Sequence, residues 1–553
     1  MVQCILNSGW WAAARYITAL FILLCSVAQG QTSILQYPLS PDHLSDDKVT
    51  AMVNGQPLPL EYFKNFETYY YQGSYARFAA DGPVNIELQM HVPIRIAFLR
   101  TVLKDIPFTQ DGCRFRFTLP RPGHYYVQLP ELGQPQRGNE NSGTYTILFM
   151  IDDLNSLRAN RMNPADPDVV DVSKRAVTSD PQKDQTEAIA NIIARGGRIY
   201  FPPGIYRTGG LRVPSDTTIY FAPGAILKAV DDARAAGERY LDLTEAKNVK
   251  ISGPGMLDGN NHDLHILNTE NSRDLTLQDV LFRNCKSWAI HLLLVEQVVC
   301  RNIRILSGKD GIDPDCARDV LIENVLILAK DDAVAVKTRK PPASTERVTV
   351  RNSIVASDAS ALKIGTETRA LMRDITFENC DVFDSDRGII LYARDGGPIE
   401  NVTWRNIRMF MLDWPHETGG APFQFLITKR GGLTPVRNCV VENITTSVVA
   451  PSSFAGLPEA PLYGLKLRNI TLKVEEPRNG KSQPYLFNVG DQVEVSVDGL
   501  FVDWQGHRDK WSSLCTDKGL KINRLVEIKC WTDWIRLYGP DALQRIPKGH
   551  ALF

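Results

Sequence analysis

The stretch SGKDGIDPDCARDVLIENVLILAKDDAVAVK, residues 307–337, contains the pattern that decides the fold. Its middle part, DVLIENVLIL, consists of two short runs of β-favouring residues on either side of a polar pivot, Asn324. The phrase returns as DLTLQDVLF, VVCRNIRIL, RVTVRNSIV, DITFENCDVF, NVTWRNIRM, CVVENITTS and LKLRNITLK. The pivots lie 22 to 37 residues apart, at Asp279, Asn302, Asn324, Asn352, Asn379, Asn406, Asn443 and Asn469. A period in this range indicates a stacked repeat protein.

The repeats predict an all-β protein built around a parallel β-solenoid. Leucine-rich repeats would show leucines at fixed offsets and a helical stretch in each unit, whereas these units alternate Val, Ile, Thr and Phe with polar residues. In a β-solenoid each coil pairs with the next at a spacing of about 4.8 Å, so equivalent side chains stack. We expect each pivot Asn to bond to the pivot amide of the neighbouring coil and to satisfy a bend in the backbone.

The rest of the chain suggests how this solenoid begins and what precedes it. The segment DQTEAIANIIARGG has an apolar helical stripe of Ala188, Ile189, Ile192 and Ile193, and predicts a helix that caps the first coil. Alternating strands separated by Gly and Pro turns predict a small β-sandwich over residues 33–155. We assign residues 156–183 to a linker, 184–510 to the solenoid and 511–553 to a tail that packs on it.

The first 30 residues have the build of a secretory signal peptide, with Arg15, an apolar run over 17–24 and small residues near Ala28. We therefore expect a secreted or periplasmic protein; Cys25 is a weaker candidate for lipid attachment, since the residues before it are large. No later apolar run is long enough to span a membrane. The near balance of 62 basic and 63 acidic residues gives no indication of a nucleic-acid partner.

The ten cysteines form no CxxC pair. We expect the five within strand-like runs to fill the core, namely Cys285, Cys300, Cys316, Cys380 and Cys439. Cys515 and Cys530 flank a short stretch of the tail, and an oxidising compartment would allow them to form a disulfide.

Three acids interrupt the apolar alternation of the opening stretch. The spacing between pivots Asn302 and Asn324 equals that between Asp310 and Asp332, so these two acids should occupy the same corner of successive coils, with Asp331 beside them. Neighbouring carboxylates repel, so one of them should keep its proton to a higher pH. Such a pair of acid and base suits glycoside hydrolysis, while a calcium site and a solvated acidic corner stay open as alternatives.

The pattern GKDGIDPDCARDVLIEN followed by KDDAVAVK resembles the core of the polygalacturonases, glycoside hydrolase family 28, where NTDGID is followed by DD on the next coil. GGRIYFPPGIYRTGGL and SWAIHLLLVEQVVCRNIRI extend the resemblance over most of residues 185–470. It implies a right-handed parallel β-helix and inverting hydrolysis without a metal or another cofactor. By position, Asp331 would be the general acid, and Asp310 and Asp332 would hold the attacking water.

The chain departs from the family pattern in three places. Gly308 and Lys309 replace Asn-Thr, residues 359–361 (ASA) replace Gly-His-Gly, and residues 390–392 (ILY) replace the Arg-Ile-Lys that holds a uronate carboxylate. The N-terminal stretches VTAMVNGQPLPLEYF and SYARFAADGPVNIEL resemble the β-sandwich that precedes the β-helix in family 49 dextranases, which cleave a neutral glucan.

Seven further residues are candidates for binding the substrate. Lys337, Lys363, Arg387 and Arg394 offer positive charge near the acids, and His291 lies one coil before Asp310. Trp414 and His416 lie in a long excursion between pivots, where an exposed indole provides an apolar face for a sugar ring.

Taken together, the sequence predicts a secreted, monomeric glycoside hydrolase that cleaves O-glycosidic bonds of a cell-wall polysaccharide, a pectin-like polyuronide or a related glycan. Three alternatives stay open: a dextranase-like hydrolase of a neutral glucan, a calcium-dependent polysaccharide lyase on the same fold, and a solenoid that binds carbohydrate without cleaving it.

Overall fold

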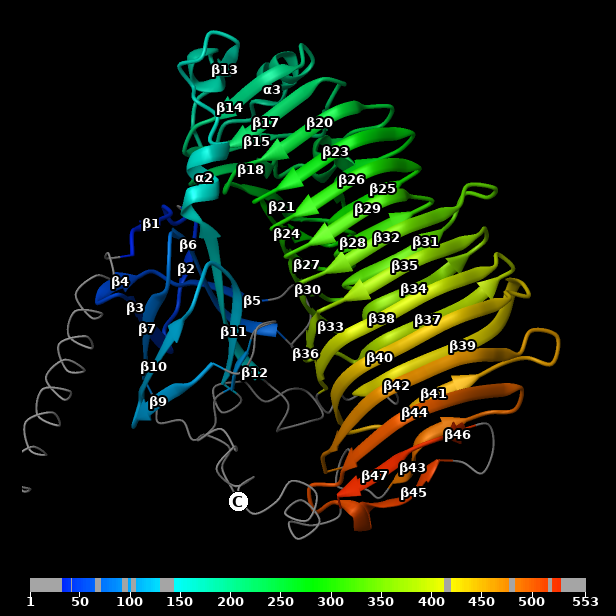
Figure 1. Cartoon of the computed structure of the whole chain (residues 1–553). Coiled ribbons are helices and arrows are strands. Elements are labelled where there is room, and N and C mark those ends of the chain that lie inside the picture. The colour runs from blue at the N-terminus through cyan, green and yellow to red at the C-terminus, as the bar shows by residue number, and fades with distance from the viewer. Residues whose placement is uncertain are drawn as a thin grey trace, which may run out of the picture.

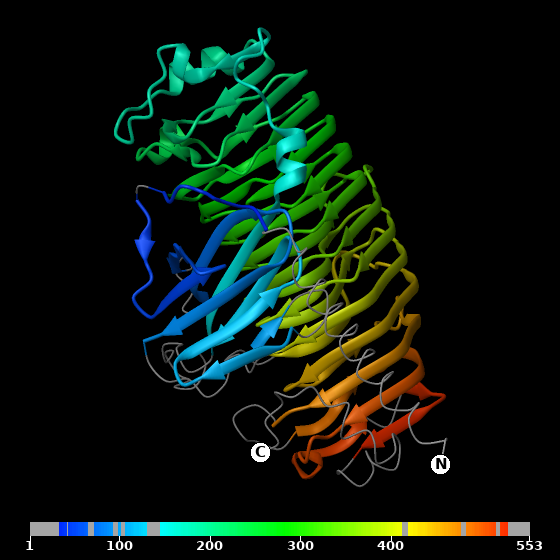
Figure 2. The same cartoon turned by 60° about the vertical axis from the view of Figure 1, so that its left-hand side comes forward.

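The computed structural model describes residues 32–40, 42–64, 71–91, 98–100, 106–129, 144–411, 419–476, 483–515 and 520–528. A small β-sandwich forms the N-terminal part, and a long right-handed parallel β-helix comes after it (Figure 1). The turned view shows the sandwich alongside the coils of the β-helix rather than beyond its end (Figure 2). The fold class predicted from the repeats is confirmed.

The sandwich consists of two sheets whose inner faces share one apolar core. The larger sheet contains β1 (Ile34–Gln36), β2 (Leu44–Ser45), β5 (Glu61–Lys64), β6 (Tyr71–Ala80), β8 (Phe98–Arg100), β11 (Gly123–Leu129) and β12 (Thr144–Asp153). The smaller sheet contains β3 (Val49–Val53), β4 (Gln56–Leu58), β7 (Val84–Met90), β9 (Phe108–Asp111) and β10 (Arg114–Leu119). Strict alternation of buried and less buried residues along β7 and β10 explains why the sequence pattern of this part is so clear.

The β-helix has three faces, each formed by one strand from every coil. On the first face lie β13 (Val169–Asp171), β14 (Gly197–Phe201), β17 (Thr217–Phe221), β20 (Lys247–Ser252), β23 (Ser272–Gln278), β26 (Val295–Arg301), β29 (Arg318–Glu323), β32 (Thr345–Arg351) and β35 (Met372–Glu378). On the second face lie β15 (Gly204–Thr208), β18 (Ala225–Ala229), β21 (Met256–His262), β24 (Leu281–Cys285), β27 (Arg304–Ser307), β30 (Leu326–Ala329), β33 (Ile354–Ser357) and β36 (Asp381–Phe383). In the last coils single strands continue these two faces, namely β38 (Ile399–Phe410), β40 (Val436–Val448), β42 (Leu462–Val474) and β44 (Val493–Asp503), and after them β46 (Leu520–Ile522) and β47 (Leu525–Ile528).

The third face carries the strands that come after the acids. It contains β16 (Leu211–Arg212), β19 (Arg239–Asp242), β22 (His265–Thr269), β25 (Ile290–Leu293), β28 (Ile312–Asp315), β31 (Val334–Thr338), β34 (Ser360–Thr368), β37 (Arg387–Asp395), β39 (Ala421–Gly432), β41 (Ser452–Ala455), β43 (Gln483–Val489) and β45 (Trp511–Cys515). All of its pairings are parallel, so residues stack on counterparts in the next coil, except at register shifts after Val336 in β31 and after Ala393 in β37.

The pivot residues behave as predicted. All eight adopt a left-handed conformation, with φ between 50° and 66°, at the bend between the first and second faces. Asn is one of the few residues other than Gly that tolerates this region. The amide of Asn324 donates to Asn302 at 3.1 Å, and that of Asn379 donates to Asn352 at 2.7 Å. In the described part of the chain, side-chain hydrogen bonds connect five of the seven neighbouring pairs of pivots, so the predicted ladder is confirmed in part, and most of its members are half-buried or exposed.

Short helices accompany the strands. They are α2 (Leu154–Asn160), α3 (Thr186–Ile193) and α4 (Ala233–Ala236), with 3-10 turns at Val172–Lys174 and Arg508–Lys510. The predicted capping helix corresponds to α3, which buries Ile189, Ile192 and Ile193 against the first coils. β13 lies within the segment assigned to the linker, and β45 to β47 lie within the segment assigned to the tail. The five core cysteines are buried; Cys530 lies outside the described residues.

The larger sheet of the sandwich packs against the second face of the β-helix. Tyr75, Tyr126, Leu148 and Met150 join one apolar cluster with the outward side chains of the second face, and Tyr126 stacks on Phe383 at 4.0 Å between ring centroids. Between these apolar contacts lie buried polar ones. Arg283 forms an ion pair with Glu61 of the sandwich at 3.4 Å and with Asp258 of the neighbouring coil at 2.8 Å. Such paired, desolvated contacts hold the two domains in one orientation.

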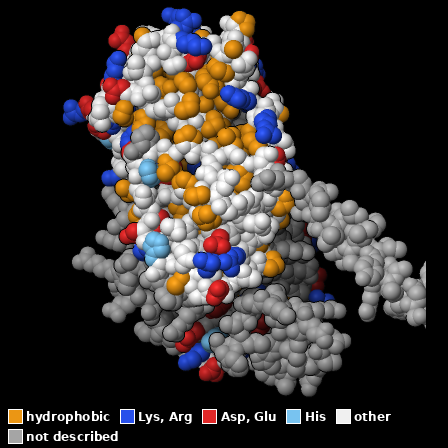
Figure 3. Space-filling model, turned by 90° about the vertical axis from the view of Figure 1, so that its left-hand side faces the viewer, with side chains coloured by type: hydrophobic (Ala, Val, Ile, Leu, Met, Phe, Trp, Pro, Cys, Tyr) orange, Lys and Arg blue, Asp and Glu red, His pale blue; other side chains and the backbone are white. Residues whose placement is uncertain are grey.

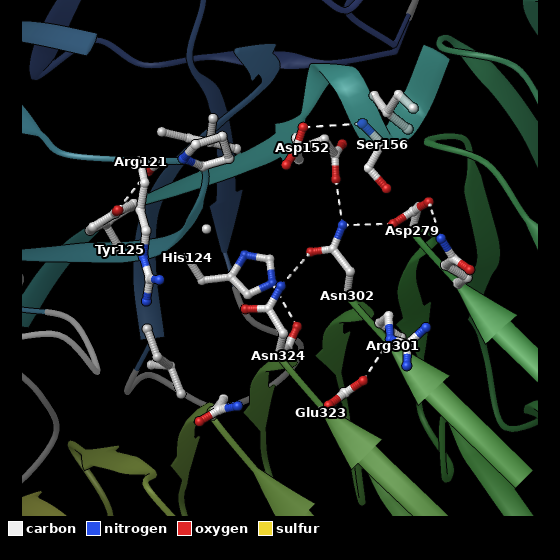
Figure 4. Close-up of a pocket in the computed structure, with 18 of the residues that line it drawn as sticks. Arg121, His124, Tyr125, Asp152, Ser156, Asp279, Arg301, Asn302, Glu323 and Asn324 are labelled. Carbon is white, nitrogen blue, oxygen red and sulfur yellow. Dashed lines mark hydrogen bonds and ion pairs between the residues drawn. The ribbon is translucent and has the colours of Figure 1, made fainter. Parts of the chain in front are cut away.

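A pocket of about 640 Å³ lies at this junction, beside the Asn ladder (Figure 4). Asn302 donates to Asp152 of the sandwich at 2.6 Å and to Asp279 of the previous coil at 2.7 Å, and His124 reaches the Asn324 carbonyl at 3.0 Å. Burial and the negative charge of Asp152 raise the pKa of Asp279 to about 6. The pocket is thus a polar seam of the domain interface, at the start of the second-face strands, whereas the three acids lie beyond their ends.

No helix among the described residues is long and apolar enough to cross a membrane. On the face seen in Figure 3, the described acidic and basic side chains are interspersed and gather into no patch of a single sign, in keeping with the net charge of −1.

Candidate active site

Three aspartates meet where the second face turns into the third. Asp310 lies between β27 and β28, and Asp331 and Asp332 lie between β30 and β31 on the next coil. The Gly311 amide donates to the Asp332 carbonyl at 2.9 Å, which places the two turns in contact. One oxygen from each of the three carboxylates lies within 4.8 Å of the others. The structure therefore brings the three acids together, at the corner that the pivot spacing indicates.

The glycine between the acids allows this close approach. A Cβ atom on Gly311 would lie 2.4 Å from the Ala333 carbonyl oxygen of the next coil. Any larger residue would push the two turns apart, and with them Asp310 and Asp332. The DGID pattern is thus a packing requirement of the site as well as a chemical one.

Two buried lysines neutralise the inner carboxylates. Lys337 Nζ lies 2.7 Å from Asp310 Oδ2 and 3.0 Å from Asp313 Oδ1. Lys363 Nζ lies 2.5 Å from Asp332 Oδ2. Since removing one partner leaves the other charge buried and unpaired, each pair fixes the position of its carboxylate.

The surroundings push the pKa values of the three acids apart. Asp331 is exposed, yet partial desolvation and the negative charges of Asp332 and Asp310 raise its pKa to about 6. Burial opposes ionisation of Asp332, but the ammonium groups of Lys363 and Lys337 lower its pKa below the ordinary value. The pKa of Asp310 is raised by burial and by Asp332, against the effect of Lys337. The site thus pairs an acid that keeps its proton with a base that has lost it.

A second group of charged and polar side chains lies next to the acids on the third face. Asp315 accepts hydrogen bonds from Arg339 Nε at 2.6 Å and from His291 Nε2 at 3.2 Å, which lower its pKa to about 2 although burial opposes this. His291 is buried, and its Nδ1 lies 3.0 Å from Asn268 Oδ1. Both of its ring nitrogens therefore have protein partners, and in this structure it supports Asp315.

The half-buried Trp288 packs against two cations of this group. Lys337 Nζ lies 4.0 Å and the Arg339 guanidinium 4.8 Å from the centroid of its ring. Cation–π contacts of this kind hold both cations beside the acids.

The coils after Asp332 carry a different set of groups. The Arg387 side chain lies 3.0 Å from Asp386 and donates to the Tyr392 hydroxyl at 3.1 Å. That hydroxyl in turn donates to Gln424 Oε1 on the next coil.

The other predicted binding residues are not brought to the acids by described contacts. Arg394 is half-buried near the far end of β37, seven residues after Arg387, which is roughly 23 Å along an extended strand. Its backbone amide donates to Thr368. Trp414 and His416 lie outside the described residues.

Three residues near the acids were not predicted as part of the site. Two of them have a signal in the sequence. Asp313 is a carboxylate on a buried strand, in GIDPD, and Trp288 is an aromatic residue one coil before the acids, in SWAIH. Tyr392 had none beyond its place in the triplet that differs from the family pattern.

Comparisons with known proteins find a family match that spans this part of the chain. Residues 207–449 match the family model described as glycosyl hydrolases family 28, a region that includes all three acids. The chain is also 24% identical over 335 residues to a Vitis vinifera protein named "Probable polygalacturonase", covering 50% of this chain and 67% of that protein.

Solved structures share the fold at low sequence identity. The family 28 exopolygalacturonase of Yersinia enterocolitica is 14% identical, with a TM-score of 0.53, and the match covers 85% of this chain and 98% of that one. Dex49A from Penicillium minioluteum is 12% identical, with a TM-score of 0.52, over 87% of this chain and 96% of that one. Both matches cover more of the chain than the β-helix makes up, so they extend into the N-terminal domain. With a family 28 match that spans the β-helix around three clustered aspartates, the chain is a glycoside hydrolase similar to the polygalacturonases.

Proposed function

We propose that this protein hydrolyses O-glycosidic bonds of a polysaccharide with inversion of configuration, using Asp331 as general acid and Asp310 and Asp332 to hold the attacking water. The observation that carries the proposal is the meeting of three carboxylates on adjacent coils, one with its pKa raised to about 6 and one with its pKa lowered. This is the division of roles that glycoside hydrolysis requires.

Each acid has a position that suits its role. Asp331 is exposed toward the substrate and donates its proton to the leaving oxygen as the bond breaks. Asp332 stays ionised through its pair with Lys363 and takes a proton from the water. Asp310, bonded to Lys337, accepts the second hydrogen of that water. No carboxylate then attacks carbon, and the bond is broken in a single displacement.

The stereochemical outcome tests this assignment. The closest carboxylate oxygens lie within 4.8 Å, near the roughly 5 to 5.5 Å usual for retaining enzymes, so inversion rests on the likeness to family 28 and on the pairing of two acids with one water. We expect proton NMR of the first-formed reducing ends to show the anomer opposite to the bond cleaved. A first product with the configuration of the substrate would contradict the single displacement, even if all three aspartates proved essential.

We also propose a class of substrate and a compartment for this protein. A pectin-like polyuronide of the plant cell wall is the first candidate, because the likeness to polygalacturonases covers the site region, and a neutral glucan is the second, because the fold of Dex49A matches most of the chain. Residues 1–30, which lie outside the described residues, support export to the periplasm or the medium. We propose that the protein acts there as a monomer.

A calcium-dependent lyase is the competing function. The three acids offer oxygens of the kind calcium prefers, but Lys337 and Lys363 already bond to Asp310 and Asp332, and their charges oppose a cation between them. We therefore expect the initial rate of sugar release to be unchanged in EDTA. Loss of activity in EDTA that calcium restores, with unsaturated products absorbing in the ultraviolet, would favour the lyase. Binding without any release of sugar would identify a carbohydrate-binding solenoid.

A further inference from the structure

The charged side chains around the three aspartates are unevenly distributed along the β-helix. On the coil before Asp331, Lys309 is exposed, and its carbonyl accepts from the Asp331 amide at 3.4 Å. On the two coils after Asp332, Lys363 of β34 and Arg387 at the start of β37 are each tied to a carboxylate, while Arg394 lies near the far end of β37. The two sides of the scissile bond therefore meet different electrostatic surroundings.

The register of the third face identifies the side chains stacked beyond Lys363. Lys363 pairs with Ile390, and Ile390 pairs with Gln424 on the coil after that. Residues in register on parallel strands project from the same side of the sheet, so this column continues from Lys363 with an apolar and an amide side chain. Neither residue adds a charge.

The charges of Lys363 and Arg387 are each already matched by a carboxylate. Lys363 lies 2.5 Å from Asp332, which the proposed reaction needs as an ionised base. Arg387 Nε lies 3.0 Å from Asp386, its Nη1 bonds to Tyr392, and Nε also bonds to the Ala359 carbonyl. A sugar carboxylate bound here would be desolvated beside Asp332 and Asp386, whose charges already match those of Lys363 and Arg387.

We infer that the sugar bound on the coils after Asp332 is uncharged, so the natural polysaccharide carries a neutral unit on that side of the scissile bond. The half-buried Tyr392 ring and its hydroxyl, which Gln424 orients, are groups that recognise the apolar face and hydroxyls of such a sugar. Lys309, on the other side, can face a uronate, so a polymer that alternates acidic and neutral units also fits. This inference rests on the proposed hydrolysis at Asp331.

A matched set of polymers tests the inference. We would measure kcat/KM on polygalacturonan, its fully methyl-esterified form, rhamnogalacturonan and dextran. We expect the best substrate to be one with a neutral unit and polygalacturonan to be slower by about tenfold or more, since like charges placed together in an interface are strongly disfavoured. Polygalacturonan as the best substrate would overturn the inference.

If the protein is not a hydrolase, none of the four polymers would be cleaved. In that case calorimetric binding of trigalacturonate and of its methyl ester decides: tighter binding of the acid overturns the inference, and tighter binding of the ester supports it.

A single charge change sharpens the test. Asp386→Asn removes the carboxylate that neutralises Arg387, so the ratio of kcat/KM on polygalacturonan to that on its methyl ester should rise several-fold. Asp395→Asn is the matched control, since Asp395 lies at the other end of β37 and pairs with Arg430 at 2.6 Å; it should leave the ratio unchanged. Equal ratios in the two variants, both folded by circular dichroism, would contradict the inference.

Discussion

Replacing Asp331 by Asn is expected to lower kcat on the natural substrate by about 100-fold or more, the range typical of losing a general acid. Asn has nearly the same shape but no proton to give to the leaving oxygen. Because Asp331 is exposed, the thermal unfolding midpoint should stay close to that of the wild type. Initial rates of reducing-sugar release, together with a melting curve, measure both effects.

The pH profile of the same variant gives an independent readout. In the wild type, activity should fall as pH rises through about 6, because Asp331 then loses the proton that it must donate. The residual activity of Asp331→Asn should lack this decline. Asp498→Asn, an exposed change on β44 and on another face, should keep both the rate and the profile. A variant at Asp331 with near wild-type turnover would show that the acid lies elsewhere.

Replacing Asp332 by Asn is expected to have the largest effect, a loss of about 1,000-fold in kcat, because the base that activates the water is removed. It should also lower the free energy of unfolding by about 3 kcal/mol, since the Lys363 ammonium is left buried without its ionised partner. The stability contributed by Asp332 is present above the ordinary pKa of Asp and is lost as pH falls through its lowered pKa, so the difference between wild type and variant should shrink in acid.

A double variant separates the two effects. Asp332→Asn combined with Lys363→Met removes both members of the pair, so much of the stability should return while kcat stays low. Denaturant unfolding and initial rates would be measured on the same samples. If the double variant regained activity along with stability, Asp332 would be a structural partner of Lys363 rather than the base.

The sequence by itself determined the fold and the position of the acids. Strand pairing in a parallel β-helix repeats with each coil, so the equal spacings Asn302 to Asn324 and Asp310 to Asp332 were enough to place the two acids on adjacent coils. The pivots could be assigned from the same periodicity, because few residues other than Gly tolerate the left-handed bend that they occupy. These are local, periodic properties, and each coil repeats the information.

Only the tertiary structure decided which charges pair. The backbone of Lys337 stacks on Asp315, yet its ammonium bonds to Asp310 and Asp313. Asp315 instead pairs with Arg339 and His291. The face on which the sandwich docks was equally hidden, since the outward apolar residues of the second face look in sequence like ordinary core alternation. The physical reason is that a long side chain can reach several neighbouring coils, and the partner that it bonds depends on burial and competing charges in three dimensions.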